Sequence, residues 1–287
     1  MMSGRATPTT LAELLELERL DRDLFRGENE PGARDRLALY GGQVAAQALR
    51  AAGATVEDSR LPHSFHGYFL RPGLVDRPVI FQVDRDRDGG SFSARHVSAV
   101  QDGEVIFSML ASFHAYRDSP TFDAVASAGA PDPEQLAPRP SVASLVEVRE
   151  VTPTRIIGRR LRHPDRLWVR ASAPLPDDPI AHACALAYAS DLGTGFGQTD
   201  VPGLPTGGPS IDHAVWFHAP IRADEWMLME LAPRKARSSR GVYDGSLRDA
   251  DGELGALIVQ EMLLRDMVLD DESLRRVADF LGVTPED

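Results

Sequence analysis

The sequence predicts an α+β protein made of two similar halves, each an antiparallel sheet wrapped around one central helix. Each half contains one helix of small residues, 41–53 and 180–192, together with several runs of strand-like composition. The strand pattern also repeats, because an offset of 149 residues carries Gly103 onto Gly252. A single helix among many strands favours a sheet that wraps around it. Joining the two sheets edge to edge would remove two exposed edges.

Composition and charge exclude several classes of protein. A chain of 287 residues with 43% hydrophobic content can fill one or two cores. The formal net charge of -12 argues against nucleic acid or an anionic membrane as a partner. Cys184 is the single cysteine, so one chain offers no disulfide or thiolate metal site. Since no apolar run reaches about 18 residues and residues 1–10 lack a signal-peptide core, we expect a soluble, cytoplasmic protein.

The first half begins with a short helix that leads into a strand. Leucines recur between residues 11 and 20, Thr9 or Thr10 can cap the helix, and a strand is expected near Leu24. The helix 41–53 follows, starting at a glycine pair and ending at a glycine. A glycine pair at a helix start lets another backbone or a ligand approach the free N–H groups.

The remainder of the first half has the composition of β-strands. The Asp102-Gly103 pair between two such runs is a strong hairpin signal. The expected strands are 63–70, 78–83, 91–100 and 104–115. A stretch rich in Pro, Ala, Ser and Asp then interrupts the pattern. We therefore expect an N-terminal repeat over 1–116, a linker over 117–142 and a C-terminal repeat over 143–287.

The second half is organised around the helix 180–192. Residues 183–189 carry no charge on any face and are rich in alanine, so this helix is expected to be buried all round. A long glycine- and proline-rich loop is expected over 193–208. The final helix should start at Asp270 or Asp271 and stop at Gly282. The expected strands are 146–151, 166–171, 210–218, 226–231, 240–248 and 254–264.

Three polar residues of the second half interrupt otherwise apolar patterns. Asp191 follows the apolar helix where burial is expected, and a desolvated carboxylate needs a partner or a function. It could also simply cap a backbone N–H group. Gln260 replaces Ala111 at the 149-residue offset, on a row that faces the helix. Ser210 adds a hydroxyl at the start of the next strand, where serines usually bond their own backbone.

Six separated segments, spread over residues 11–265, resemble the acyl-CoA thioesterase II family. They are Gly41-Gly-Gln-Val44, His63-Ser-Phe-His-Gly-Tyr-Phe-Leu-Arg-Pro-Gly73, Asp88-Gly-Gly-Ser-Phe-Ser-Ala-Arg95, Ala187-Tyr-Ala-Ser-Asp-Leu192, Ile211-Asp-His-Ala-Val-Trp-Phe-His218 and Val259-Gln-Glu261. The resemblance implies a double hotdog fold and hydrolysis of fatty acyl-CoA thioesters without metal or cofactor. It also implies that Asp191, Ser210 and Gln260 activate a water molecule. Other members have threonine where Ser210 stands, so the methyl group that restrains the hydroxyl rotamer is lost.

Two further binding elements are expected from this chemistry. The backbone N–H groups of Gly42 and Gln43, at a helix N-terminus, are candidates to stabilise the thioester oxygen as it gains charge. The densest basic cluster could meet the phosphates of CoA or could be a solvated loop. That cluster consists of Arg234, Lys235, Arg237 and Arg240.

Other functions remain as alternatives at this stage. A catalytic triad of Ser210, His213 and Asp212 is disfavoured, because adjacent strand residues point to opposite faces and no Gly-x-Ser-x-Gly motif occurs. A hotdog enoyl-CoA hydratase and a non-catalytic acyl-CoA-binding protein are the other candidates. By analogy with other hotdog proteins, we also expect a homodimer or larger homo-oligomer. Four histidines are expected in the core or at interfaces rather than as metal ligands, namely His63, His66, His114 and His218.

Overall fold

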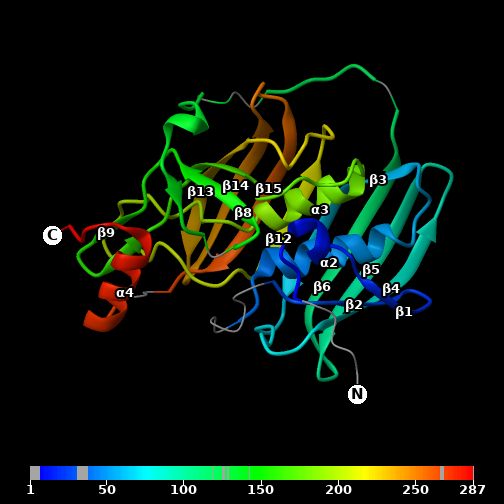
Figure 1. Ribbon diagram of the computed structural model, residues 1–287, viewed down its shortest axis with the longest axis horizontal. Coiled ribbons are helices and arrows are strands. Elements are labelled where there is room, and N and C mark those ends of the chain that lie inside the picture. Colours follow the sequence, from blue (N-terminus) through cyan, green and yellow to red (C-terminus); the bar gives the residue numbers. More distant parts are fainter. Residues whose placement is uncertain are drawn as a thin grey trace.

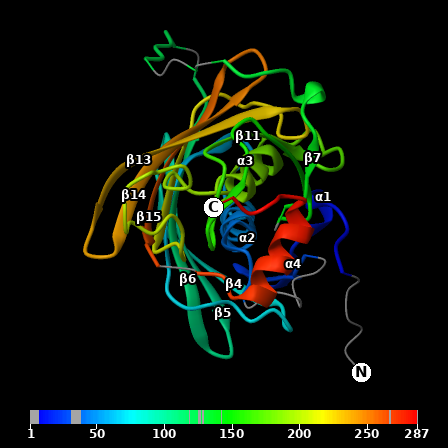
Figure 2. The same cartoon turned by 90° about the vertical axis from the view of Figure 1, so that its left-hand side faces the viewer.

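One curved sheet contains most strands of the molecule. A computed structural model describes residues 7–30, 38–117, 119–124, 127, 129–141, 143–265 and 268–286, so the expected linker 117–142 lies partly outside the described residues. The described residues form a 13-stranded antiparallel sheet that curves around two helices (Figures 1 and 2). Its strand order is β1 (Glu18–Asp21), β2 (Leu24–Gly27), β4 (Val79–Asp88), β5 (Phe92–Gln101), β6 (Glu104–Ala115), β3 (Arg60–Phe69), β12 (Asp212–Phe217), β15 (Leu254–Leu263), β14 (Arg240–Asp249), β13 (Met227–Arg237), β11 (Arg166–Ala171), β8 (Val146–Glu150) and β7 (Pro138–Arg139).

The two halves meet where β3 pairs with β12. The strands are antiparallel, and Val215 lies opposite Phe65. This pairing confirms the expectation that the two sheets join edge to edge. The hairpin between β5 and β6 is also confirmed, with Asp102 and Gly103 at φ 50° and 77° in its turn.

The internal repeat needs one correction. Ala111 of β6 and Gln260 of β15 are both buried, so the 149-residue offset keeps these strands on the same face. In β3 and β12, however, the buried residues Phe65 and His213 are 148 residues apart. Because side chains alternate between faces, only an even offset can relate β3 to β12. A single offset of 149 is therefore wrong for this pair of strands.

The helices α2 (Gly41–Gly53) and α3 (Pro179–Ala189) lie side by side within the curve of the sheet (Figures 1 and 2). Asp178 caps α3 by accepting a hydrogen bond from the Ile180 N–H at 3.0 Å, and proline occupies the first turn, where its missing N–H costs nothing. Every residue of α3 from 181 to 189 is buried, as expected from its uncharged composition.

The end of α3 differs from the prediction. The helix stops at Ala189 rather than continuing to residue 192, so Asp191 lies in the following loop and not in the helix. Ser190 holds this end, because its hydroxyl donates to the Ala187 carbonyl at 2.9 Å and also bonds the His213 ring at 2.7 Å. The loop that follows is packed against the sheet, with Phe196 2% exposed.

The peripheral helices agree with the expected capping residues. Thr10 caps α1 (Leu11–Leu14), Asp270 caps α4 (Asp271–Leu281), and Gly282 ends α4 at φ 63°. The sequence did not indicate a short 3₁₀ helix, η2 (Pro133–Gln135), or the hairpin of β9 (Arg155–Ile157) and β10 (Arg160–Arg162). Among the described residues, no helix is long and apolar enough to cross a membrane.

Replacement of Gly42 tests the close packing of α2 on α3. A Cβ atom on Gly42 would lie 2.4 Å from the Tyr188 carbonyl oxygen, which is part of the α3 backbone and cannot rotate away. We expect Gly42→Ala to lower the free energy of unfolding by about 1–3 kcal/mol, despite alanine's better helix propensity. Urea denaturation measures the change. Gly90→Ala is the control, since no atom lies within 4 Å of its Cβ position, and equal stability of both variants would contradict the packing argument.

Candidate active site

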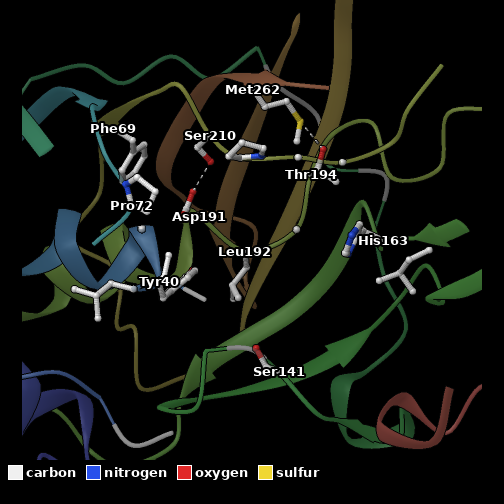
Figure 3. Close-up of a pocket in the computed structure, with 18 of the residues that line it drawn as sticks. Tyr40, Phe69, Pro72, Ser141, His163, Asp191, Leu192, Thr194, Ser210 and Met262 are labelled. Carbon is white, nitrogen blue, oxygen red and sulfur yellow. Dashed lines mark hydrogen bonds between the residues drawn. The ribbon is translucent and has the colours of Figure 1, made fainter. Parts of the chain in front are cut away.

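A cavity of about 930 Å³ lies at the end of the helix pair where α2 begins and α3 ends. Residues of both halves line it, including Tyr40 and Phe69 from the first half and Asp191, Ser210 and Met262 from the second (Figure 3). Most lining side chains are apolar. Its size and composition suit a small-molecule ligand with an apolar part.

Three polar side chains meet at one wall of this cavity. Asp191 Oδ1 accepts a hydrogen bond from the Gln260 amide at 2.8 Å and another from the Ser210 hydroxyl at 3.3 Å. Gln260 Nε2 also bonds the Ser210 hydroxyl. Figure 3 shows Asp191 and Ser210 pointing toward one another. The structure thus brings together the three residues that the sequence singled out.

Their burial differs from residue to residue. Asp191 is half-buried and lines the cavity, so the expectation that it would be fully buried is wrong. Gln260 is 1% exposed and lies behind the cavity wall. Asp191 can therefore meet a ligand or water while buried donors hold one of its oxygens. Such hydrogen bonds offset part of the cost of removing the carboxylate from water.

Tyr243 fixes the orientation of the Gln260 amide. Its hydroxyl donates to Gln260 Oε1, and an oxygen held in this way turns the amide NH₂ toward Asp191 and Ser210. Burial, with the nearby Asp191 charge, raises the pKa of Tyr243 well above its usual value, so the hydroxyl keeps its proton and remains a donor. Sequence reasoning missed Tyr243, whose inward orientation in β14 is its only signal.

His213 belongs to the core rather than to a catalytic triad with Ser210. Its side chain is fully buried, its Nε2 bonds the Ser190 hydroxyl, and burial lowers its pKa. Asp212 instead accepts a hydrogen bond from the Glu261 N–H at 2.7 Å. The nearby histidine therefore holds the end of α3, which supports the earlier rejection of a Ser-His-Asp arrangement.

The N-terminus of α2 lies directly against Asp191. A Cβ atom on Gly41 would come within 2.6 Å of Asp191 Oδ2, so glycine is required for this approach. The first amides of a helix have no acceptor in the preceding turn and favour negative charge. Gln43 uses its buried side chain for structure, since its Oε1 accepts from the Glu30 N–H at 3.2 Å. The role expected for the Gly42 and Gln43 amides stays a prediction.

The basic cluster of the β13–β14 hairpin is separate from the cavity. Arg234 forms a bidentate ion pair with Asp244 at 2.6 and 2.7 Å, and Arg240 pairs with Glu261 at 3.4 Å. Arg234, Lys235, Arg237 and Arg240 are all described, and none of them lines the cavity. Two arginines that sequence reasoning missed, Arg71 and Arg265, do line it.

The four histidines expected in the core or at interfaces lie nearer the surface. His66 and His218 are exposed, whereas His63 and His114 are partly buried. The core alternative is therefore wrong, because their strand positions face away from the helices or lie at strand ends, whereas the interface alternative stays a prediction. Within the described ranges, no group of three His, Cys, Asp or Glu side chains is placed to hold a metal ion.

Both halves match models of known protein domains. Residues 31–114 match the acyl-CoA thioesterase N-terminal domain, and residues 122–264 match the acyl-CoA thioesterase C-terminal domain. The chain is 36% identical to acyl-coenzyme A thioesterase 8 of Homo sapiens, over 91% of each protein. It is 32% identical to acyl-CoA thioesterase 2 of Haemophilus influenzae, over 89% of this chain and 96% of that protein.

Solved structures give the same result. An acyl-CoA thioesterase II from Mycobacterium marinum superimposes with a TM-score of 0.73 at 39% identity, covering 89% of this chain and 98% of that one. A protein from Alicyclobacillus acidocaldarius described as having the hot dog fold superimposes with a TM-score of 0.71 at 20% identity, covering 90% and 98%, and supports the fold alone. The fold is therefore the predicted double hotdog, and the chain belongs to the acyl-CoA thioesterase II family.

Proposed function

We propose that the protein hydrolyses fatty acyl-CoA thioesters to a free fatty acid and CoA, using a water molecule held by Asp191, Ser210 and Gln260. The observation that carries this proposal is the shared Asp191 Oδ1, which accepts hydrogen bonds from the other two residues at the wall of a large, mostly apolar cavity. The names of the family's domains and relatives supply the substrate class.

The three residues divide the work of hydrolysis. Asp191 takes a proton from water as the water oxygen attacks the thioester carbonyl carbon. The carbon–sulfur bond then breaks, and Asp191 returns the proton to the leaving CoA thiolate. Ser210 and Gln260 hold the carboxylate, and with it the water, in position for attack. Tyr243 acts through Gln260 and is a positioning residue.

The N-terminus of α2 is suited to stabilise the charge that develops on the carbonyl oxygen. Amides already oriented before the reaction are effective at such sites. In this proposal the N–H groups of Gly42 and Gln43 donate to the oxygen. The absence of a side chain on Gly41 lets Asp191 and the helix end approach the same small volume.

Two rival functions are less well supported. A hydratase of this fold usually pairs a catalytic histidine with the aspartate, whereas the side chains that donate to Asp191 are those of Ser210 and Gln260. A non-catalytic acyl-CoA-binding protein has no need for the joint contact of Ser210 and Gln260 with one carboxylate oxygen. We also propose the division into repeats 1–116 and 143–287 with a linker over 117–142. A cytoplasmic location and a homodimer or larger homo-oligomer remain predictions.

The role of the Asp191 carboxylate is tested by Asp191→Asn. Losing the proton acceptor should lower kcat by about 100-fold or more, with KM changed little. Release of free CoA, followed with a thiol reagent across acyl-CoAs of several chain lengths, measures both constants. Asp200→Asn is the control, because the side chain of Asp200 is 100% exposed in the loop after α3. Near-full activity of Asp191→Asn would contradict the assignment.

The position of the CoA phosphates is tested by reversing charge at the cavity and on the hairpin. Arg265 lines the cavity and is exposed, so Arg265→Glu should raise KM for acyl-CoA by about tenfold while kcat changes less. Arg237→Glu on the hairpin is the matched variant and should leave KM nearly unchanged. A rise in KM for Arg237→Glu alone would contradict phosphate binding at the cavity and assign it to the hairpin.

A further inference from the structure

A second cavity, of about 220 Å³, lies at the opposite end of the helix pair, where α3 begins. Its walls include Pro62 and His114 from the first half and Pro179, His182 and residues 217–221 from the second. The side chains that line it are mostly apolar, apart from the histidines. The proposed function makes no use of this cavity.

The second cavity is the internal-repeat counterpart of the first. Residues 69–73 line the first cavity, and residues 217–221, which follow them at the 148-residue offset of β3 and β12, line the second. The helix starts correspond in the same way, since Gly41 lines the first cavity and Pro179 the second. One helix turn later, His182 stands where the first cavity has Val44.

The second cavity lacks all three residues of the proposed hydrolytic group. Counting from the helix starts, the position of Asp191 is taken by Gly53, whose Cβ position faces Ile180 of α3 at 2.9 Å. The strand offsets place Pro62 at the counterpart of Ser210, and Ala111 at the counterpart of Gln260. No Asp or Glu stands among the described residues that line this cavity, so a ligand bound here would meet no carboxylate able to activate water.

His182 lines the second cavity and carries a buried hydrogen-bond donor. The residue is 6% exposed, and its Nδ1 accepts from the Ala223 N–H at 3.1 Å. Burial lowers the pKa of His182, so the ring is neutral. Because Nδ1 accepts a hydrogen bond, the single proton of the neutral ring lies on Nε2. Nε2 is buried on the opposite edge of the ring and has no hydrogen-bond partner among the described residues. A buried donor without an acceptor costs about 1–3 kcal/mol, and a ligand acceptor that meets Nε2 after a small shift of the ring would recover that cost.

We propose that the second cavity binds a short acyl group, whose carbonyl oxygen accepts a hydrogen bond from His182 Nε2, and does not hydrolyse it. The ligand class rests on the proposed function, because the cavity is the counterpart of one that would hold an acyl chain. Its size fits a chain of about six carbons, since an apolar cavity of about 150 Å³ holds benzene. The carbonyl can belong to a free fatty acid or to a thioester.

Photolabelling of the full chain tests the proposal. The probe is hexanoic acid carrying a diazirine on its chain, and the adducts are mapped by mass spectrometry. We expect adducts within 179–186 and 217–221, both in the unaltered protein and in Asp191→Asn. Adducts confined to the first cavity, such as at 69–73, or the absence of adducts would overturn the proposal. Because this readout needs no turnover, it is independent of whether the proposed hydrolysis is correct.

Two variants connect the labelling to the cavity. Ala219→Leu places a larger side chain in the second cavity, and His182→Phe removes the donor while keeping a ring. Each variant should lower labelling of this cavity by about fivefold, which for His182→Phe corresponds to the loss of one hydrogen bond. Circular dichroism and CoA release show that each variant is folded. Unchanged labelling in either variant would overturn the proposal. Excess hexanoate should reduce labelling of the second cavity if the ligand is the free acid, and a hexanoyl-CoA thioether should reduce it if the ligand is the thioester. Unchanged labelling with both competitors would also overturn the proposal.

Discussion

The pairing of β3 with β12 is the interaction on which the candidate site depends. It joins the two halves into one sheet and thereby fixes α2 beside α3. The start of α2 then meets the residues after α3, at Gly41 and Asp191, while the end of α2 meets the start of α3, at Gly53 and Ile180. Neither cavity is complete within one half. The two halves contribute unequally to the first cavity, because Asp191, Ser210 and Gln260 all come from the second half.

A half-buried carboxylate is useful only if its surroundings hold it in one orientation. Asp191 is held by Ser210 and Gln260, Gln260 is oriented by Tyr243, and Tyr243 is fully buried in the sheet. Each donor in this series of hydrogen bonds has a defined acceptor. A buried polar network orders a site, instead of destabilising it, under this condition. Because these partners are packed in the sheet, the Asp191 carboxylate is held in one orientation.

The same geometry explains why the two cavities can differ in function. The fold repeats the walls, but the polar residues do not repeat: Gly53, Pro62 and Ala111 stand at the counterparts of Asp191, Ser210 and Gln260. Of the histidines that line the second cavity, His182 carries a buried donor without a partner among the described residues. The walls need only apolar residues of suitable size, whereas hydrolysis needs a specific set of charged and polar groups.

Much of the fold could be predicted from the sequence because its signals are local. The uncharged run 183–189, the glycine pair before α2, the Asp102-Gly103 turn and the caps of α4 each depend on neighbours in the chain. Asp191 and Gln260 stood out because they interrupt apolar patterns, whereas the joint role of these two residues with Ser210 came from the resemblance to the acyl-CoA thioesterase II family.

What depends on distant contacts could not be predicted. The end of α3 is set by the contact of Ser190 with His213, 23 residues away. The role of Tyr243 depends on its pairing with β15, and Arg71 and Arg265 gain importance only from the shape of the cavity. The hairpin of β9 and β10 has strands too short to show any periodicity.

The most direct test of the central claim is a single turnover in water enriched in oxygen-18, with enzyme in excess over acyl-CoA. If Asp191 activates a water molecule, the heavy oxygen enters the fatty acid, and the peptide that contains Asp191 stays unlabelled. If Asp191 attacked the thioester itself, hydrolysis of the resulting anhydride at the aspartyl carbon would place the heavy oxygen on Asp191 and leave the fatty acid unlabelled. That second result would contradict the account.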